Sequence, residues 1–169
     1  MPDRKTEIKL GIIGCGLISH AHGLAVRKLE GIGFVACASR SLVNAEAWAR
    51  EYGCDKAYTD YREMLEQEQL DGVVIATWPS DHRAHIEACM DAGVRYILCE
   101  KALTTSLDDA MAIWHRCRSE KVIVMEGFMY RHHPAIAKIE ELLRSRNLGT
   151  IDNIFAAFHM YDPEDAATD

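Results

Sequence analysis

Continuous apolar runs alternate along the chain with stretches in which apolar side chains recur every three or four residues. The first pattern is typical of strands buried on both faces of a sheet, and the second is typical of amphipathic helices. The clearest buried strand is the β-branched run from Gly72 to Thr77. The alternation predicts strands at residues 8–13, 33–39, 72–77, 95–99 and 122–128, and helices at residues 19–29, 43–52, 60–67, 81–92, 106–118 and 134–145.

Capping residues mark the ends of several predicted helices. Asp60 with Glu63, and Ser106 with Asp109, predict N-terminal caps. Gly53 predicts a C-terminal cap, because glycine adopts the left-handed conformation that ends many helices.

Repeated strand–helix units predict an α/β fold with a doubly wound parallel sheet. Right-handed crossovers bring the carboxyl ends of the strands to one edge, where ligands of such folds bind. We expect residues 1–128 to form this domain. We expect residues 129–169 to form a linker helix and the first strand, Ile151–Tyr161, of an incomplete second domain.

The overall charge and polarity exclude several classes of protein. The formal net charge of −7 argues against a nucleic-acid surface, because phosphate binding needs clustered Lys and Arg. No apolar run is long enough to span a membrane, and the polar start of the chain does not resemble a signal peptide. We therefore expect a cytoplasmic protein.

Neither the 6 cysteines nor the 8 histidines predict a metal site. The cysteines form no C-x-x-C pair, and several lie in apolar runs, which favours reduced thiols in the core. The sequences His20-Ala21-His22 and His132-His133 lack a matching cluster of cysteines or carboxylates.

The segment Gly14-Cys15-Gly16-Leu17-Ile18-Ser19 follows a predicted strand and precedes a predicted helix, which is the context of a dinucleotide-binding motif. Gly14 permits a tight turn, and Gly16 lets the backbone approach a pyrophosphate. The amides near Leu17 and Ile18 face that negative charge. Ser19 replaces the third glycine of the motif. The alternative is a glycine-rich turn without a ligand.

The end of the second predicted strand reads Ser39-Arg40-Ser41. NAD sites usually offer an acidic residue here for the 2′-hydroxyl of the ribose. Two hydroxyls and a guanidinium suit a 2′-phosphate instead, so we expect NADP as the preferred cofactor, with NAD possible. Alternatively, Ser41 caps the next helix and Arg40 is solvated. Both roles can coexist.

The segment from Ala76 to His82 follows the central buried strand and is expected to line the cofactor pocket through Ala76, Thr77, Trp78, Pro79 and His82. Trp78 could cover a ring of the ligand. The alternative for Trp78 and His82 is loop packing and helix capping.

Two further segments leave strands at the same predicted edge. Glu100 and Lys101 could orient a substrate hydroxyl and stabilise charge during hydride transfer, or could form a surface ion pair of little consequence. Glu126 lies within an apolar strand, and Arg131 is its nearest candidate partner. A structural brace and a role in the site, with Arg131 among the cofactor-binding residues, both stay open.

These segments, in this order, resemble the Gfo/Idh/MocA oxidoreductase family, which is named for glucose–fructose oxidoreductase and inositol dehydrogenase. The resemblance covers nearly the whole chain, and its last part is similar to members that act on sugars and dihydrodiols. The residues that carry it are Gly14-Cys15-Gly16-Leu17-Ile18 with His22, Ala76-Thr77 with Pro79 and His82, Ala92-Gly93 with Glu100-Lys101, and Phe128 to Pro134.

The resemblance implies a Rossmann domain followed by an α/β domain with an open antiparallel sheet, which supplies substrate contacts and drives homo-oligomerisation. It implies an NAD(P)-dependent enzyme that oxidises a secondary alcohol of a sugar, polyol or dihydrodiol. Lys101 would be the catalytic lysine beside the nicotinamide and the substrate hydroxyl. Ser39 and Arg40 would meet the ribose of the adenosine.

The chain departs from the family in four places. The usual Glu-Lys-Pro reads Glu100-Lys101-Ala102, Ser39 stands where many members have Asp, and Trp78 stands where Pro is common. The downstream Asp-x-x-x-His element with the catalytic histidine is absent from the 169 residues. We therefore expect a truncated form that binds cofactor without full activity. The alternatives are a non-catalytic dinucleotide-binding module and an assembly fragment that pairs through Ile151–Tyr161.

Overall fold

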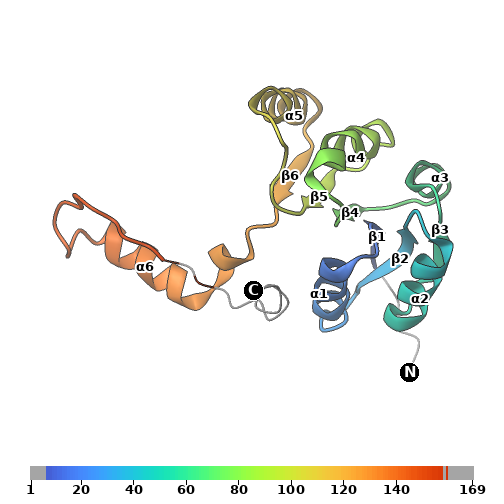
Figure 1. Ribbon diagram of the computed structural model, residues 1–169, viewed down its shortest axis with the longest axis horizontal. Coiled ribbons are helices and arrows are strands. Elements are labelled where there is room, and N and C mark those ends of the chain that lie inside the picture. The colour runs from blue at the N-terminus through green and yellow to red at the C-terminus, as the bar shows by residue number, and fades with distance from the viewer. Residues whose placement is uncertain (1–6, 158, 160–169) are drawn as a thin grey trace, which may run out of the picture. The chain divides into compact units, whose positions relative to one another are not determined.

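In the computed structural model, which describes residues 7–157 and 159, six parallel strands form one sheet in the order β3-β2-β1-β4-β5-β6 (Figure 1). The chain builds outward from β1 to β3 and then returns to the other side of β1 with β4. This confirms the predicted doubly wound sheet. The strands are β1 (Ile8–Ile13), β2 (Ile32–Ala38), β3 (Lys56–Tyr58), β4 (Gly72–Ile75), β5 (Tyr96–Cys99) and β6 (Ile123–Glu126).

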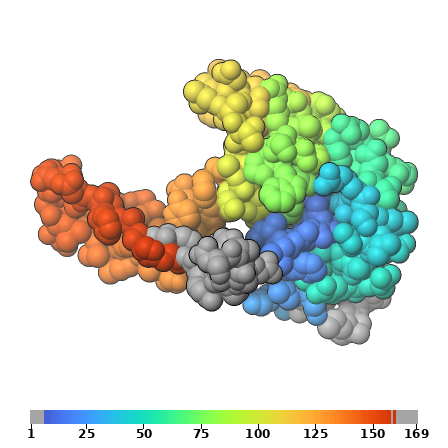
Figure 2. Space-filling model, in the orientation of Figure 1, coloured from blue at the N-terminus to red at the C-terminus, as the bar shows by residue number. Residues whose placement is uncertain are grey.

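The sheet is covered by helices on both faces. Side chains of α1 and α2 contribute to one apolar cluster with the sheet, while side chains of α3, α4 and α5 contribute to the other. The space-filling view shows α4 and α5 side by side (Figure 2). The helices are α1 (Leu17–Val26), α2 (Leu42–Tyr52), α3 (Tyr61–Gln67), α4 (Pro79–Asp91) and α5 (Leu107–Glu120).

Most predicted helix ends are confirmed by their caps. The side chain of Asp60 accepts a hydrogen bond from the amide of Arg62 (2.8 Å), and Ser106 accepts one from the amide of Asp109 (3.2 Å). Gly53 ends α2 with a φ of 70°. Glu63 does not complete a capping pair with Asp60, because its carboxylate accepts a hydrogen bond from the Gln67 side chain instead.

The chain divides into two compact units, residues 1–128 and 129–169. The described part of the second unit contains a 3₁₀ helix, η1 (Met129–His132), and α6 (Pro134–Arg144). The predicted strand Ile151–Tyr161 is wrong where the structure describes it: residues 151–157 and 159 belong to neither a helix nor a strand, while 158, 160 and 161 lie outside the described residues. β-Propensity alone does not make a strand, because ladder hydrogen bonds need a neighbour.

An aromatic group anchors α2 to the sheet. Trp48 is 1% exposed and lies between Phe34 of β2 and Tyr52, with ring centroids 5.2 and 4.7 Å away. The ring of Tyr52 in turn contacts Gly23 of α1, where a Cβ atom would come within 2.5 Å of it. This group therefore sets the spacing of α1, α2 and the sheet.

We expect Trp48→Ala to lower the free energy of unfolding by about 3–5 kcal/mol, because it leaves a large cavity in a packed core. Urea denaturation followed by circular dichroism measures this change. Trp114→Ala is the matched control, since Trp114 of α5 is 48% exposed and should lose far less. Equal losses in the two variants would contradict the anchoring role of Trp48.

Candidate cofactor-binding site

The turn between β1 and α1 requires glycine at its first position. Gly14 has a φ of +98°, and a Cβ atom there would lie 2.6 Å from the carbonyl oxygen of Ala76. The amide of Gly14 donates to the carbonyl of Ala38 at 2.8 Å, so the turn is fixed to the ends of both β2 and β4. A side chain at Gly14 would meet backbone on a neighbouring strand.

Neither the backbone conformation nor a neighbouring atom of the protein requires glycine at position 16. Its φ of −89° suits any residue, and a Cβ atom there would meet no atom within 4 Å. Gly16 is the N-cap of α1, whose first turn has no side-chain cap and no acidic residue. The N-terminus of α1 therefore offers backbone amides and the positive end of the helix dipole to an anion. Ser19, at the third glycine position, is fully buried, as its small size allows.

The segment after β2 combines a cap with an exposed cation. Ser41 caps α2, because its hydroxyl accepts a hydrogen bond from the amide of Asn44 at 3.4 Å. Ser39 accepts one from the amide of Ser41 at 3.4 Å. The capping interpretation of Ser41 is thus confirmed. Arg40 is exposed, and its guanidinium forms no ion pair with any residue in the described part of the chain.

The segment after β4 divides its predicted residues between the surface and the interior. Trp78 is 72% exposed, and Pro79 begins α4. His82 is completely buried, with Nδ1 2.8 Å from the carbonyl oxygen of Ala102 and Nε2 3.0 Å from that of Thr77. His82 therefore contacts the backbone of two loops, the one after β4 and the one after β5, from the interior of the domain. His82 is not among the residues that line the groove described below, and its role in cofactor binding stays a prediction.

Glu100 and Lys101 follow β5 but do not form the surface ion pair that was the alternative to a functional role. The carboxylate of Glu100, 8% exposed, pairs with His22 of α1, with Nε2 and Oε1 2.8 Å apart. Lys101 is exposed, and its ammonium makes no ion pair within residues 7–157 and 159. Glu126 accepts a hydrogen bond from the amide of Leu103 at 2.7 Å, whereas its candidate partner Arg131 belongs to the second unit.

Together these segments line a groove of about 1190 Å³ in the first unit, which is large enough for an extended ligand. Its wall follows the carboxyl ends of β1, β2, β4 and β5, the edge predicted for ligand binding. The predicted residues that line it are Gly14, Gly16, Leu17, Ile18, Ser39, Arg40, Ser41, Ala76, Thr77, Trp78, Pro79, Glu100 and Lys101.

Several lining residues were missed by the sequence analysis, among them Thr59, Tyr61 and His85. Thr59 and Tyr61 follow β3, which is too short to produce a pattern. His85 lies three residues after His82 on α4, and this helical spacing was a usable signal. The His85 ring packs edge-on against Tyr61, and its Nδ1 lies 3.0 Å from the hydroxyl oxygen of Thr77. Burial lowers the pKa of His85 to about 4, so its imidazole is neutral at pH 7.

The cysteines and histidines do not gather into a metal site in the part of the chain that the structure describes. All six cysteines are free, as predicted, and burial raises the pKa of Cys89 to about 12, which keeps its thiol protonated. His133 is the N-cap of α6, where its ring accepts a hydrogen bond from the amide of Ala135. Within residues 7–157 and 159, every helix is too short or too polar to cross a lipid bilayer.

Comparison with known proteins gives consistent matches. The sequence model of the Gfo/Idh/MocA family, described as an oxidoreductase family with an NAD-binding Rossmann fold, matches residues 8–128. D-xylose 1-dehydrogenase (NADP(+)) 2 of Haloferax volcanii is 34% identical over 93% of the chain and 47% of its own length. Trans-1,2-dihydrobenzene-1,2-diol dehydrogenase of Sus scrofa is 29% identical over 89% of the chain and 45% of its own length.

A solved structure agrees with these matches. The crystal structure of an oxidoreductase from Agrobacterium radiobacter, in complex with NAD⁺, L-tartaric acid and magnesium, superimposes with a TM-score of 0.80 at 27% identity. The match covers 86% of the chain and 42% of that protein. The chain thus spans less than half the length of the relatives it matches.

The two glycines of the turn are expected to respond differently to alanine. Gly14→Ala should lower the free energy of unfolding by about 1–3 kcal/mol, because it combines an unfavourable φ with a backbone clash. Gly16→Ala should change stability by less than about 0.5 kcal/mol and still weaken binding of a dinucleotide by about tenfold or more, because its methyl group enters the groove. Denaturation and calorimetric titration measure the two effects. Unchanged affinity in Gly16→Ala would contradict pyrophosphate binding at this turn.

Proposed function

Because the chain belongs to the Gfo/Idh/MocA family of oxidoreductases with an NAD-binding Rossmann fold, we propose that it is the cofactor-binding part of an NADP-preferring dehydrogenase. The proposed substrate is a secondary alcohol of a sugar, polyol or dihydrodiol. The observation that carries the cofactor assignment is the exposed Arg40, which follows β2 in a segment without an acidic residue and forms no ion pair within residues 7–157 and 159.

The groove of about 1190 Å³ has room for an extended ligand such as a nicotinamide dinucleotide. The pyrophosphate would lie against the amides of Leu17 and Ile18, which Gly16 leaves accessible. The adenosine half would extend toward Ser39 and Arg40, and the nicotinamide half toward Lys101. The fit rests on the open space at Gly16, since a side chain there would occupy the place of the phosphates.

Two features support NADP over NAD. A carboxylate at the end of β2 would accept hydrogen bonds from both ribose hydroxyls and repel a 2′-phosphate, but the segment Ser39-Arg40-Ser41 carries none. A guanidinium, in contrast, forms charge-assisted hydrogen bonds with phosphate. The relative from Haloferax volcanii is named as NADP-dependent, whereas the structure from Agrobacterium radiobacter holds NAD⁺, so both cofactors occur among the relatives.

When bound, a nicotinamide cofactor accepts the hydride from the carbinol carbon. The residue of this chain proposed to assist is Lys101, which lines the groove and whose ammonium forms no ion pair within the described residues. We propose that it donates a hydrogen bond to the substrate oxygen and stabilises the negative charge that develops there. The proton of the hydroxyl must pass to a base, and the family resemblance assigns this role to a histidine outside the 169 residues.

A dinucleotide-binding module without catalysis is the second candidate. The chain spans 47% of the xylose dehydrogenase and 45% of the dihydrodiol dehydrogenase, so the activity of the whole protein stays a proposal. Titration with NADPH and an assay of sugar and diol oxidation separate the two candidates. Turnover supports the enzyme, whereas binding of NADPH by this chain without turnover is the result that both candidates predict. Homo-oligomerisation stays a prediction, which sedimentation would test.

We expect Arg40→Ala to weaken NADPH binding by about 10- to 100-fold, the cost of losing a charge-assisted hydrogen bond to phosphate. NADH binding should change by less than about threefold, because NADH has no 2′-phosphate. Calorimetric titration of both cofactors measures the difference. Arg50→Ala, which removes an exposed arginine of α2 outside the groove, should bind both as the wild type does. An equal loss for NADPH and NADH in Arg40→Ala would contradict the assignment.

A further inference from the structure

We infer that His22 is a positioning residue that acts through Glu100 to hold Lys101 at the nicotinamide half of the groove. The inference rests on the proposed dinucleotide function and adds the residue that aligns Lys101 with the rest of the site. His22 lies on α1 and Glu100 on the loop after β5, which are 78 residues apart in the sequence.

The contact between His22 and Glu100 is largely protected from solvent. Their side chains are 18% and 10% exposed, and His22 Nε2 lies 2.8 Å from Glu100 Oε1. A charged or polar pair in such a place keeps its geometry, because a partner left alone would lose a hydrogen bond that water cannot fully replace. Of the two groups, only Glu100 lines the groove, so His22 acts on a ligand indirectly.

Glu100, which is held by His22, in turn contacts the backbone of Lys101. Its second oxygen, Oε2, accepts a hydrogen bond from the amide of Lys101 at 3.3 Å, and its own amide donates to the carbonyl of Ile75 at 2.9 Å. Gly127 packs beside it: a Cβ atom at this glycine would lie 3.3 Å from Glu100 Oε1. The carboxylate is thus held on three sides and has little freedom to turn away from Lys101.

The remainder of the loop is held from two other elements. His82 of α4 contacts the carbonyl oxygen of Ala102 at 2.8 Å, and Glu126 of β6 accepts a hydrogen bond from the amide of Leu103 at 2.7 Å. Residues 100–103 are therefore fixed from α1, α4 and β6, while the Lys101 side chain lines the groove. Because these contacts fix the backbone of the loop, the Lys101 side chain extends from a well-defined backbone position.

His22 belongs to the same helix, α1, whose N-terminus is proposed to bind the pyrophosphate. The same helix presents its N-terminal amides to the pyrophosphate, and His22 lies one turn after Ile18 on the same side of the helix. His22 therefore links the element that holds the phosphates to the loop that carries Lys101. Removing it should disturb the nicotinamide half of the groove and spare the adenosine half.

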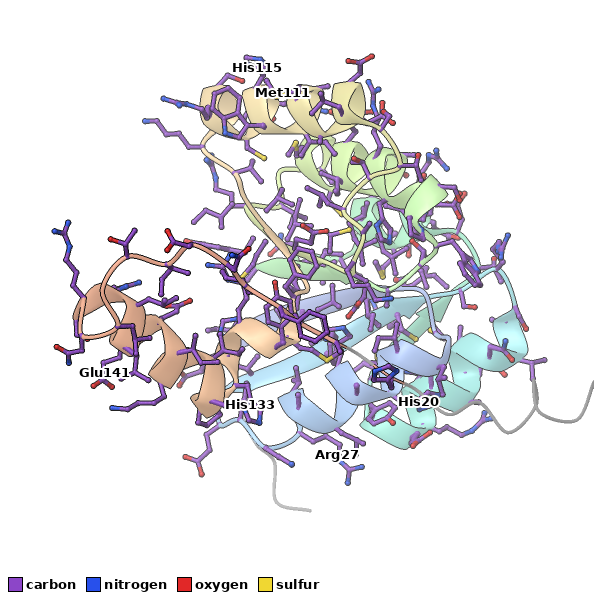
Figure 3. All side chains as sticks on the ribbon, turned by 60° about the vertical axis from the view of Figure 1, so that its left-hand side comes forward. His20, Arg27, Met111, His115, His133 and Glu141 are labelled. Carbon is purple, nitrogen blue, oxygen red and sulfur yellow. The ribbon has the colours of Figure 1, made fainter. Side chains whose placement is uncertain are left out.

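The experiment compares two ligands, NADPH and 2′,5′-ADP, which contains only the adenosine half of the cofactor. In the 169-residue chain, His22→Ala should weaken NADPH binding by about tenfold and change 2′,5′-ADP binding by less than about twofold. Retained 2′,5′-ADP binding also shows that the variant folds. His20→Ala is the matched control, because His20 lies on the same helix and bonds Tyr52 of α2 (Figure 3). It should bind both ligands normally.

A double-mutant cycle tests whether His22 acts through Lys101. Lys101 is also expected to contact the nicotinamide half of the cofactor, so Lys101→Met alone should weaken NADPH binding by about tenfold. Adding His22→Ala should cause almost no further loss, because the second change removes the support of a group already absent. His22→Gln, which keeps a side-chain donor, should restore part of the affinity.

Additive losses, or equal losses for NADPH and 2′,5′-ADP, would overturn the positioning role and leave the dinucleotide function intact. Unchanged NADPH binding in His22→Ala would do the same. If the wild-type chain binds neither ligand, the dinucleotide function fails and the positioning role falls with it.

Discussion

The close approach between the turn after β1 and the end of β4 determines where every part of the groove lies. At Gly14 the backbone turns so near the carbonyl of Ala76 that no side chain fits, and the amide of Gly14 is bound to the carbonyl of Ala38. Because β1 lies between β2 and β4, this one turn is tied to both halves of the sheet. It sets the direction in which α1 leaves the sheet and hence the position of its free N-terminal amides.

Three positive features then follow the groove although the chain carries a formal net charge of −7. Arg40 lies near one end, the N-terminus of α1 lies in the turn, and Lys101 follows β5. A ligand with phosphates on one half and a reacting carbon on the other matches this order. Glu100 also lines the groove, but its carboxylate contacts His22 and forms no ion pair with Lys101 among the described residues. The carboxylate of Glu126 accepts a hydrogen bond from the amide of Leu103.

The sequence alone predicted the elements that carry a strong local pattern. The buried run at β4, the glycine turn and the caps at Asp60 and Ser106 all formed as expected, because each depends on neighbouring residues. β3 was missed because three residues give no periodicity. The strand expected after Ile151 was wrong over its described residues, because strand formation depends on a partner that propensity does not supply. Likewise, the pairing of Glu100 with His22 in place of Lys101 depends on long-range packing. The sequence analysis offered an ion pair with Lys101 only as an alternative, and it could not find His22 as the partner because His22 lies 78 residues away in the sequence.

The central claim is that the amides at the start of α1 bind the pyrophosphate of a nicotinamide dinucleotide. The most direct test is a titration of the isotope-labelled chain with NADPH, followed by the backbone amide signals in nuclear magnetic resonance spectra. The account predicts saturable shifts that are largest for Gly16, Leu17 and Ile18, because their N–H groups gain hydrogen bonds to phosphate oxygens. Saturable binding with those three signals unmoved, or no binding at all, would contradict it.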